Sequence, residues 1–173
     1  MRTLPILAVL LLSPVTMSAQ DGEQAPLEIY GRILAGEEKL AEAQVLVFKG
    51  NEQVGAVTTG KSGKFDLRLG MNGQYSLEFR KEGFAPKRIL IDTQLPKFPA
   101  GAEVVIAPIG MDLTLMEKAK FDGANTDDLD FPFALIKWSK RDHAFVQDAD
   151  YTADMQRTSG ALLLVAARSD QKR

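Results

Sequence analysis

The stretch KFDLRLG, residues 64 to 70, decides the fold class of this chain of 173 residues. Apolar residues from Phe65 to Leu69 alternate with Asp66 and Arg68, so an extended segment here has one apolar face and one charged face. A period of two is typical of a strand that lies with one face on a core and the other in water. KFDLRLG therefore predicts a half-buried strand.

Six other stretches between residues 27 and 117 are short and apolar, and turns rich in glycine or charge separate them. Seven strands at this spacing predict an antiparallel sandwich or barrel. We expect KFDLRLG and QYSLEFRK to form a central hairpin with Phe65 and Tyr75 in the core, and the last strand to bend or break at Pro108 and Gly110. The six stretches are LEIYGRIL (27–34), AQVLVFK (43–49), QVGAVTT (53–59), QYSLEFRK (74–81), KRILID (87–92) and EVVIAPIGMDLTLME (103–117).

The segment GAVTTGKS, residues 55 to 62, matches the phosphate-binding pattern G-x-x-x-x-G-K-[ST]. A phosphate loop needs a helix after it, because the amides at the helix N-terminus bind the phosphates. Ser62 is instead followed by the alternating strand pattern, so we expect no nucleotide to bind. Gly63 is expected to supply a positive φ in a hairpin turn flanked by the solvated side chains of Lys61 and Lys64.

Four stretches carry a resemblance to a known family: YGRIL (30–34), LAEAQVLVF (40–48), TGKSGKFDLRL (59–69) and GQYSLEFRKEGF (73–84). They resemble the carboxypeptidase regulatory-like domain, a transthyretin-like sandwich common in bacterial envelope proteins. The resemblance implies a seven-stranded Greek-key sandwich and is nearly silent on activity. Gly60 and Ser62 stand where the family has acidic or amide residues, which implies that the turn holds no cation.

The enzymes that resemble this family need residues that this chain lacks. Zinc carboxypeptidases use two histidines and a glutamate around the metal, whereas His143 is the only histidine here. The hydroxyisourate hydrolases of the transthyretin-like group have several histidines and end in Tyr-Arg-Gly-Ser, whereas this chain ends SDQKR. We therefore expect a non-enzymatic module without a metal or another cofactor.

The N-terminal sequence predicts export. Residues 1–19 combine one early arginine, an apolar run and small residues at the end, which is typical of a cleaved signal peptide. Residues 20–26 are interpreted as a linker, 27–118 as the sandwich and 119–173 as a C-terminal extension. The chain has no cysteine for lipid attachment, so we expect a periplasmic or secreted protein with no stable membrane span after cleavage. A net charge of −2 without a basic patch argues against nucleic acid as a partner.

The extension has a different pattern from the rest of the chain. FALIKWS (133–139) is interpreted as a strand and KRDH as a turn, with a helix starting at Asp148 or Asp150. The helix is expected to bend or break at Gly160, and the alternative is a helix to Ser159 followed by a strand from Ala161 to Ala167. The four aspartates at 122, 127, 128 and 130 do not follow the EF-hand pattern and are interpreted as a solvated loop.

The candidate interaction residues are Trp138, His143 and Tyr151, all in the extension. We expect partner recognition mainly after Lys120, the partner being another envelope protein or a glycan; an extension that merely covers a sheet edge is the alternative. A carbohydrate-binding surface would use the aromatic side chains of the extension, although burial against the sheet also explains them. A small hydrolase would use His143, with Ser139 and Asp142 near it in sequence.

Overall fold

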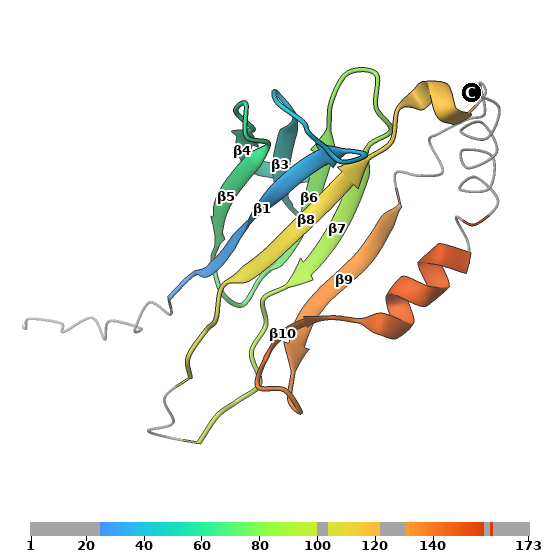
Figure 1. Cartoon of the computed structure of the whole chain (residues 1–173). Helices are drawn as coiled ribbons and strands as arrows, with labels where there is room; N and C mark the ends of the chain where they lie inside the picture. Colours follow the sequence, from blue (N-terminus) through green and yellow to red (C-terminus); the bar gives the residue numbers. More distant parts are fainter. Residues whose placement is uncertain (1–24, 100–103, 122–130, 158–159, 161–173) are drawn as a thin grey trace, which may run out of the picture.

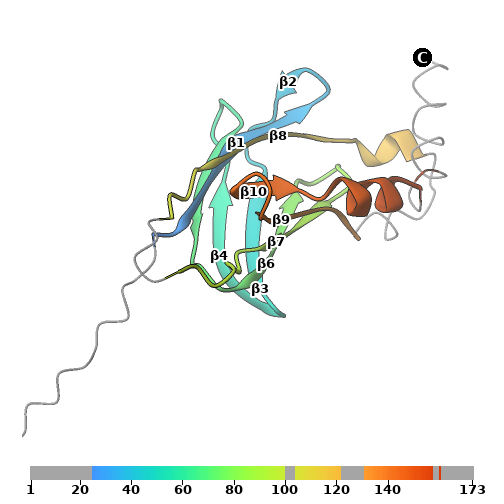
Figure 2. The same cartoon turned by 90° about the horizontal axis from the view of Figure 1, so that it is seen from below.

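The computed structural model describes residues 25–99, 104–121, 131–157 and 160. The predicted signal peptide, the acidic loop and the alternative strand at 161–167 lie outside these residues. The described part contains ten strands in two sheets, a short 3-10 helix η1 (Lys118–Phe121) and an α-helix over residues 149–157 (Figure 1). In Figure 2 the two sheets are seen as layers, and β10 lies between the level of β9 and that of β8.

The first sheet has four strands and the second has six. The first contains β1 (Leu27–Ala35), β2 (Glu38–Lys39), β5 (Lys64–Leu69) and β8 (Ile109–Leu115). The second has the order β10-β9-β7-β6-β3-β4. Its strands are β3 (Gln44–Lys49), β4 (Glu52–Thr58), β6 (Gln74–Arg80), β7 (Lys87–Asp92), β9 (Pro132–Ser139) and β10 (Ala144–Gln147).

Strand β1 is the centre of the first sheet. Tyr30 pairs with Asp66 of antiparallel β5 on one side and with Gly110 of parallel β8 on the other. Gly31 makes the second pairing possible, because a Cβ atom at this position would lie only 1.7 Å from the Met111 carbonyl oxygen. The glycine in YGRIL is therefore needed for the close approach of the β8 backbone.

Alternating side chains from both sheets form one core. Phe65 of β5 is 4% exposed, and its ring packs edge-to-face on Phe79 of β6, with ring centroids 5.6 Å apart. Tyr75 is also buried, which confirms the predicted core faces of both strands. Ala134 and Ile136 of β9 belong to the same core, so the extension supplies part of the sandwich interior.

The predicted sandwich with a C-terminal α/β extension is confirmed, and each of the seven predicted stretches contains a strand. The last of these strands begins at Ile109, directly after Pro108, and continues through Gly110. Strands β2 and β10 and helix η1 were not predicted. The predicted hairpins on either side of β5 are wrong, since β5 pairs with β1 whereas β4 and β6 lie in the other sheet. Alternation identifies the buried face of a strand but not its partner, and both turns cross from one sheet to the other.

The first strand of the extension is β9, which adds to the edge of β7 in parallel and pairs Ile136 with Ile91. A turn at KRDH leads to β10, and a helix starts after Asp148 as predicted. Asp148 caps this helix, because its Oδ1 accepts a hydrogen bond from the Tyr151 amide at 3.1 Å. Its other oxygen lies 2.6 Å from Lys137 Nζ, and this hydrogen bond, followed by that of the amide, lowers the pKa of Asp148.

Candidate functional site

The three predicted interaction residues do not form one site. The Tyr151 hydroxyl donates a hydrogen bond to the carbonyl oxygen of Pro132, at the start of β9. Trp138 lies near the end of the same strand, six residues away, which corresponds to about 20 Å along an extended chain. His143 is exposed in the turn between β9 and β10. The helix and the turn thus hold Tyr151 and His143 toward opposite ends of β9.

Trp138 is part of an aromatic cluster. Its ring meets Phe145 of β10 edge-to-face at a centroid distance of 5.3 Å and Phe98 at 6.0 Å, with interplanar angles of 79° and 86°. A sugar-stacking surface needs rings that lie flat toward solvent, whereas these are nearly perpendicular and Trp138 is half-buried. The geometry therefore favours packing over carbohydrate binding.

The turn around His143 uses its polar groups internally. The Ser139 hydroxyl donates to Asp142 Oδ2 at 2.6 Å and accepts a hydrogen bond from the Asp142 amide at 3.2 Å. The hydroxyl bond, and after it the bond from Arg141, lowers the pKa of Asp142. His143 itself has a φ of 50°, a left-handed conformation that suits a tight turn. A nucleophile would need the serine hydroxyl to bond the histidine, and here it bonds Asp142.

The GAVTTGKS segment runs from the middle of β4 through the turn before β5, so a strand follows it rather than a helix. Gly63 has the predicted positive φ, 66°. The Thr59 hydroxyl is buried, where it donates to the Leu40 carbonyl oxygen at 2.8 Å and accepts from the Ala43 amide at 3.0 Å. These bonds connect Thr59 to the segment from Leu40 to Ala43 and so have a structural role. A strand follows the turn, so there is no helix N-terminus here to bind a phosphate.

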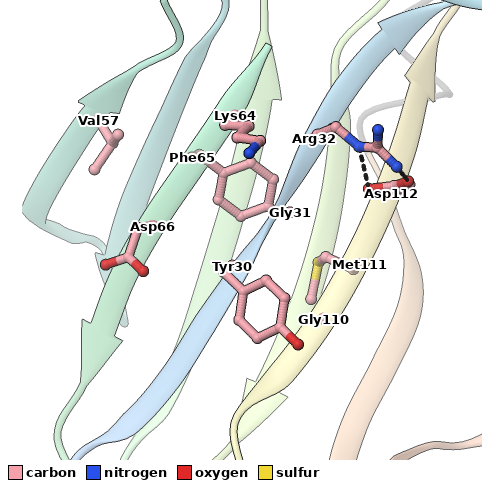
Figure 3. A pocket seen from close by; sticks show the side chains of 10 residues that line it. All are labelled: Tyr30, Gly31, Arg32, Val57, Lys64, Phe65, Asp66, Gly110, Met111 and Asp112. Carbon is pink, nitrogen blue, oxygen red and sulfur yellow. Dashed lines mark hydrogen bonds and ion pairs between the residues drawn. The ribbon is translucent and has the colours of Figure 1, made fainter. Parts of the chain in front are cut away.

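A hollow of about 950 Å³ lies over the first sheet and is lined mainly by β1, β5 and β8 (Figure 3). The Tyr30 side chain is 51% exposed there, and its ring lies against Gly110. Arg32 Nη2 lies 2.7 Å from Asp112 Oδ2 across the paired strands, and the hydrogen bond lowers the pKa of Asp112. These two charges satisfy each other, and the other charged lining residues, Lys64 and Asp66, are of opposite sign, so the hollow has no strong preference for a charged ligand.

A second depression, which we call the β8 groove, lies between the edge strand of the first sheet and the β7–β9–β10 side of the second. Its volume is about 300 Å³. Strands β8 and β10 are each the last strand of a sheet, and neither pairs with the other. The lining residues are Lys87, Ile89, Met111, Asp112, Leu113, Thr114, Phe133, Ala134, Ile136 and Gln147.

Lys87 is the unusual residue of the β8 groove. Its ammonium group lies 5.4 Å from the centre of the Phe133 ring, a cation–π contact, and burial lowers its pKa. No carboxylate contacts Lys87 among the residues that the structure describes. The position was not among the predicted sites, yet the sequence contains a signal: in KRILID, Lys87 has the same alternation position as the core residues Ile89 and Ile91.

The residues that the structure describes contain no group of three or more histidine, cysteine or acidic side chains arranged to hold a metal ion. They also contain no helix that is both long enough and apolar enough to cross a membrane.

Comparisons with protein-family models and with curated proteins give no match. Solved structures similar to this chain include the 3-chlorocatechol 1,2-dioxygenase of Rhodococcus opacus, with 14% identity over 57% of this chain and 62% of that one at a TM-score of 0.39. A DUF3823 family protein from Parabacteroides merdae has 14% identity over 65% of this chain and 49% of that one, with a TM-score of 0.34. The pilus 2b backbone protein of group B streptococcus has 13% identity over 56% of this chain and 43% of that one, with a TM-score of 0.35. The chain spans less than two thirds of each protein, and likeness of this degree assigns neither activity nor partner. The resemblance to the carboxypeptidase regulatory-like domain stays a prediction.

Proposed function

We propose that this protein is a non-enzymatic module of the bacterial envelope, exported by its leader, that acts by surface recognition at the β8 groove. The observation that carries the proposal is the meeting of two edge strands, β8 and β10, at a partly apolar groove; among the described residues, no further strand pairs with the outer edge of either. Exposed edges are sites where another chain can add, and proteins normally block them with charge, proline or a covering element.

The proposal also agrees with the chemistry of the described residues. His143 lies in an exposed turn, and Ser139 and Asp142 bond each other. The leader supports export, and the resemblance of the sandwich motifs supports an envelope module. The extension contributes β9 and β10 to the lining of the groove, and β9 also covers the edge of β7. We therefore propose that the extension both covers a sheet edge and takes part in recognition.

The test is cross-linking in the bacterium from which the chain comes. A photo-crosslinking residue replaces Thr114 at the β8 groove and, in a matched control, Thr58 on the opposite edge strand β4. We expect the fractionated protein to begin near Gln20 by intact mass and a discrete cross-linked product from position 114 alone. A chain retained in the cytoplasm with Met1 intact would contradict export, and equal products from both positions would contradict recognition at the groove.

A further inference from the structure

We infer that the β8 groove binds an extended peptide segment of a partner protein, added as a strand beside β8 with one of its carboxylates against Lys87. The inference rests on the proposed function and names the class of partner. Three observations carry it: the direction of the β8 backbone groups, the apolar lining, and a half-buried cation that no carboxylate contacts in the described part of the chain.

The backbone of β8 has hydrogen-bonding groups directed to its free edge. The Met111 carbonyl oxygen points at Gly31 of β1. Because successive residues of a strand direct their backbone groups to opposite edges, those of Asp112 and Thr114 point away from β1. Within the described residues, β8 pairs with β1 only. An extended segment can therefore add to β8 by the hydrogen bonds used in β-augmentation.

The lining of the groove suits alternate side chains of such a strand. Leu113 comes from β8 and Phe133, Ala134 and Ile136 from β9, so the depression behind the free edge is largely apolar. A volume of about 300 Å³ is at the lower limit of small-molecule sites. The groove is thus suited to one or two side chains of a bound strand rather than to a large compact ligand.

Lys87 decides the charge of the segment. Asp112 and Lys87 are the two charged residues of the lining, and Asp112 is already bonded to Arg32. A half-buried ammonium group without a counter-charge is costly, and a carboxylate delivered by a ligand offsets that cost with a charge-assisted hydrogen bond. The lowered pKa of Lys87, caused by burial, agrees with this environment.

A partner peptide fits the groove better than a second copy of this chain. A symmetric dimer formed through β8 would bring two Lys87 side chains to the same contact, and like charges repel. A small anion such as free phosphate would meet Lys87 but leave the β8 edge unpaired. An acidic extended segment satisfies both the backbone edge and the lysine.

The probe is a displayed library of random octapeptides, selected on the mature chain (residues 20–173). The best peptide and its amide version, with Glu replaced by Gln or Asp by Asn, are then measured by fluorescence anisotropy. Lys87→Met removes the charge at similar length, Lys87→Arg keeps it, and Thr114→Pro removes one outward N–H while leaving the β1 pairing. Hydrogen exchange of the wild type with and without the peptide reports the backbone directly, whatever the folding of the variants.

We expect the selected peptides to share an acidic position, and Lys87→Met to weaken binding about tenfold or more, as for a lost charge-assisted bond. Lys87→Arg should retain most of the affinity, and the amide peptide should bind about as weakly to the wild type as to Lys87→Met. Bound peptide should slow exchange at the Asp112 and Thr114 amides and leave that of Leu113 unchanged.

Four results would overturn the inference. Peptides without an acidic preference, or equal binding to Lys87→Met, would remove the role of Lys87. Unchanged exchange at Asp112 and Thr114 would exclude strand addition. A wild-type dimer that Thr114→Pro converts to monomer would assign the edge to a second copy. Cytoplasmic retention of the chain would contradict the proposed function alone, because peptide binding is measured on purified protein.

Discussion

Ile136→Ala measures how far the C-terminal extension holds the sandwich together. Ile136 lies on β9, is 7% exposed and belongs to the main core. The substitution removes three carbon atoms, worth about 2.4 kcal/mol at about 0.8 kcal/mol for each buried methylene, and leaves a cavity that adds to the loss. We expect the free energy of unfolding to fall by about 3 to 4 kcal/mol, a large fraction of the roughly 5 to 15 kcal/mol of a typical domain.

Phe131→Ala is the matched control. Phe131 precedes β9 and its side chain is 63% exposed, so its removal should cost less than about 0.5 kcal/mol although it deletes a whole ring. Both variants are compared with the wild type by urea unfolding of residues 20–173, followed by the fluorescence of Trp138, the only tryptophan. A loss below about 1 kcal/mol for Ile136→Ala, or a loss no larger than that of Phe131→Ala, would refute the reasoning that β9 completes the core.

Three further predictions concern the sheets and the groove. Gly31→Ala should prevent the pairing of β1 with β8 and yield an insoluble or strongly destabilised protein. Gly60→Ala is the control and should melt like the wild type, because a Cβ atom at this position meets open space. Equal melting temperatures of the two variants would contradict the close approach of the β8 backbone to Gly31. Phe65→Ala should cost about 3 to 5 kcal/mol in urea unfolding and Lys61→Ala less than about 0.5 kcal/mol, and comparable losses would mean that the buried face is misassigned. Burial lowers the pKa of Lys87 in the folded state, so the unfolded state binds more protons between that pKa and the ordinary lysine value. The free energy of unfolding, measured relative to that of Lys87→Met, should therefore rise with pH across this range. A difference in free energy that does not change with pH would contradict burial of this group.

The sequence predicted those features that depend on a single segment, such as the buried face of a strand or the cap of a helix. Phe65 and Leu69 alternate with charged residues, and the structure buries them as the pattern indicates. Asp148 is a helix cap recognisable from its residue type and place, and its side chain bonds the amide three residues later. Such features depend on local geometry, which a single segment contains.

Pairing between strands was beyond the reach of the same patterns. Nothing in FALIKWS shows that β9 adds in parallel to β7, and β10 has only four residues, too few for a clear period. The β8 groove depends on both strands. Phe133 lines it because β9 pairs with β7, and Gln147 lines it because β10 pairs with β9. Lys87 shared an inward alternation position, but a lysine there is usually interpreted as a strand end in solvent.

The pairing of β1 with β8 has a consequence for the kinetics of folding. Arg32 and Asp112 are 80 residues apart in the chain and lie side by side in the first sheet. A loop of that length must close before the contact contributes any stability, and all-β domains dominated by distant contacts fold in roughly milliseconds to seconds rather than microseconds. During synthesis the first sheet therefore stays incomplete until residue 115 has left the ribosome, because β8 is the last of its four strands in the chain.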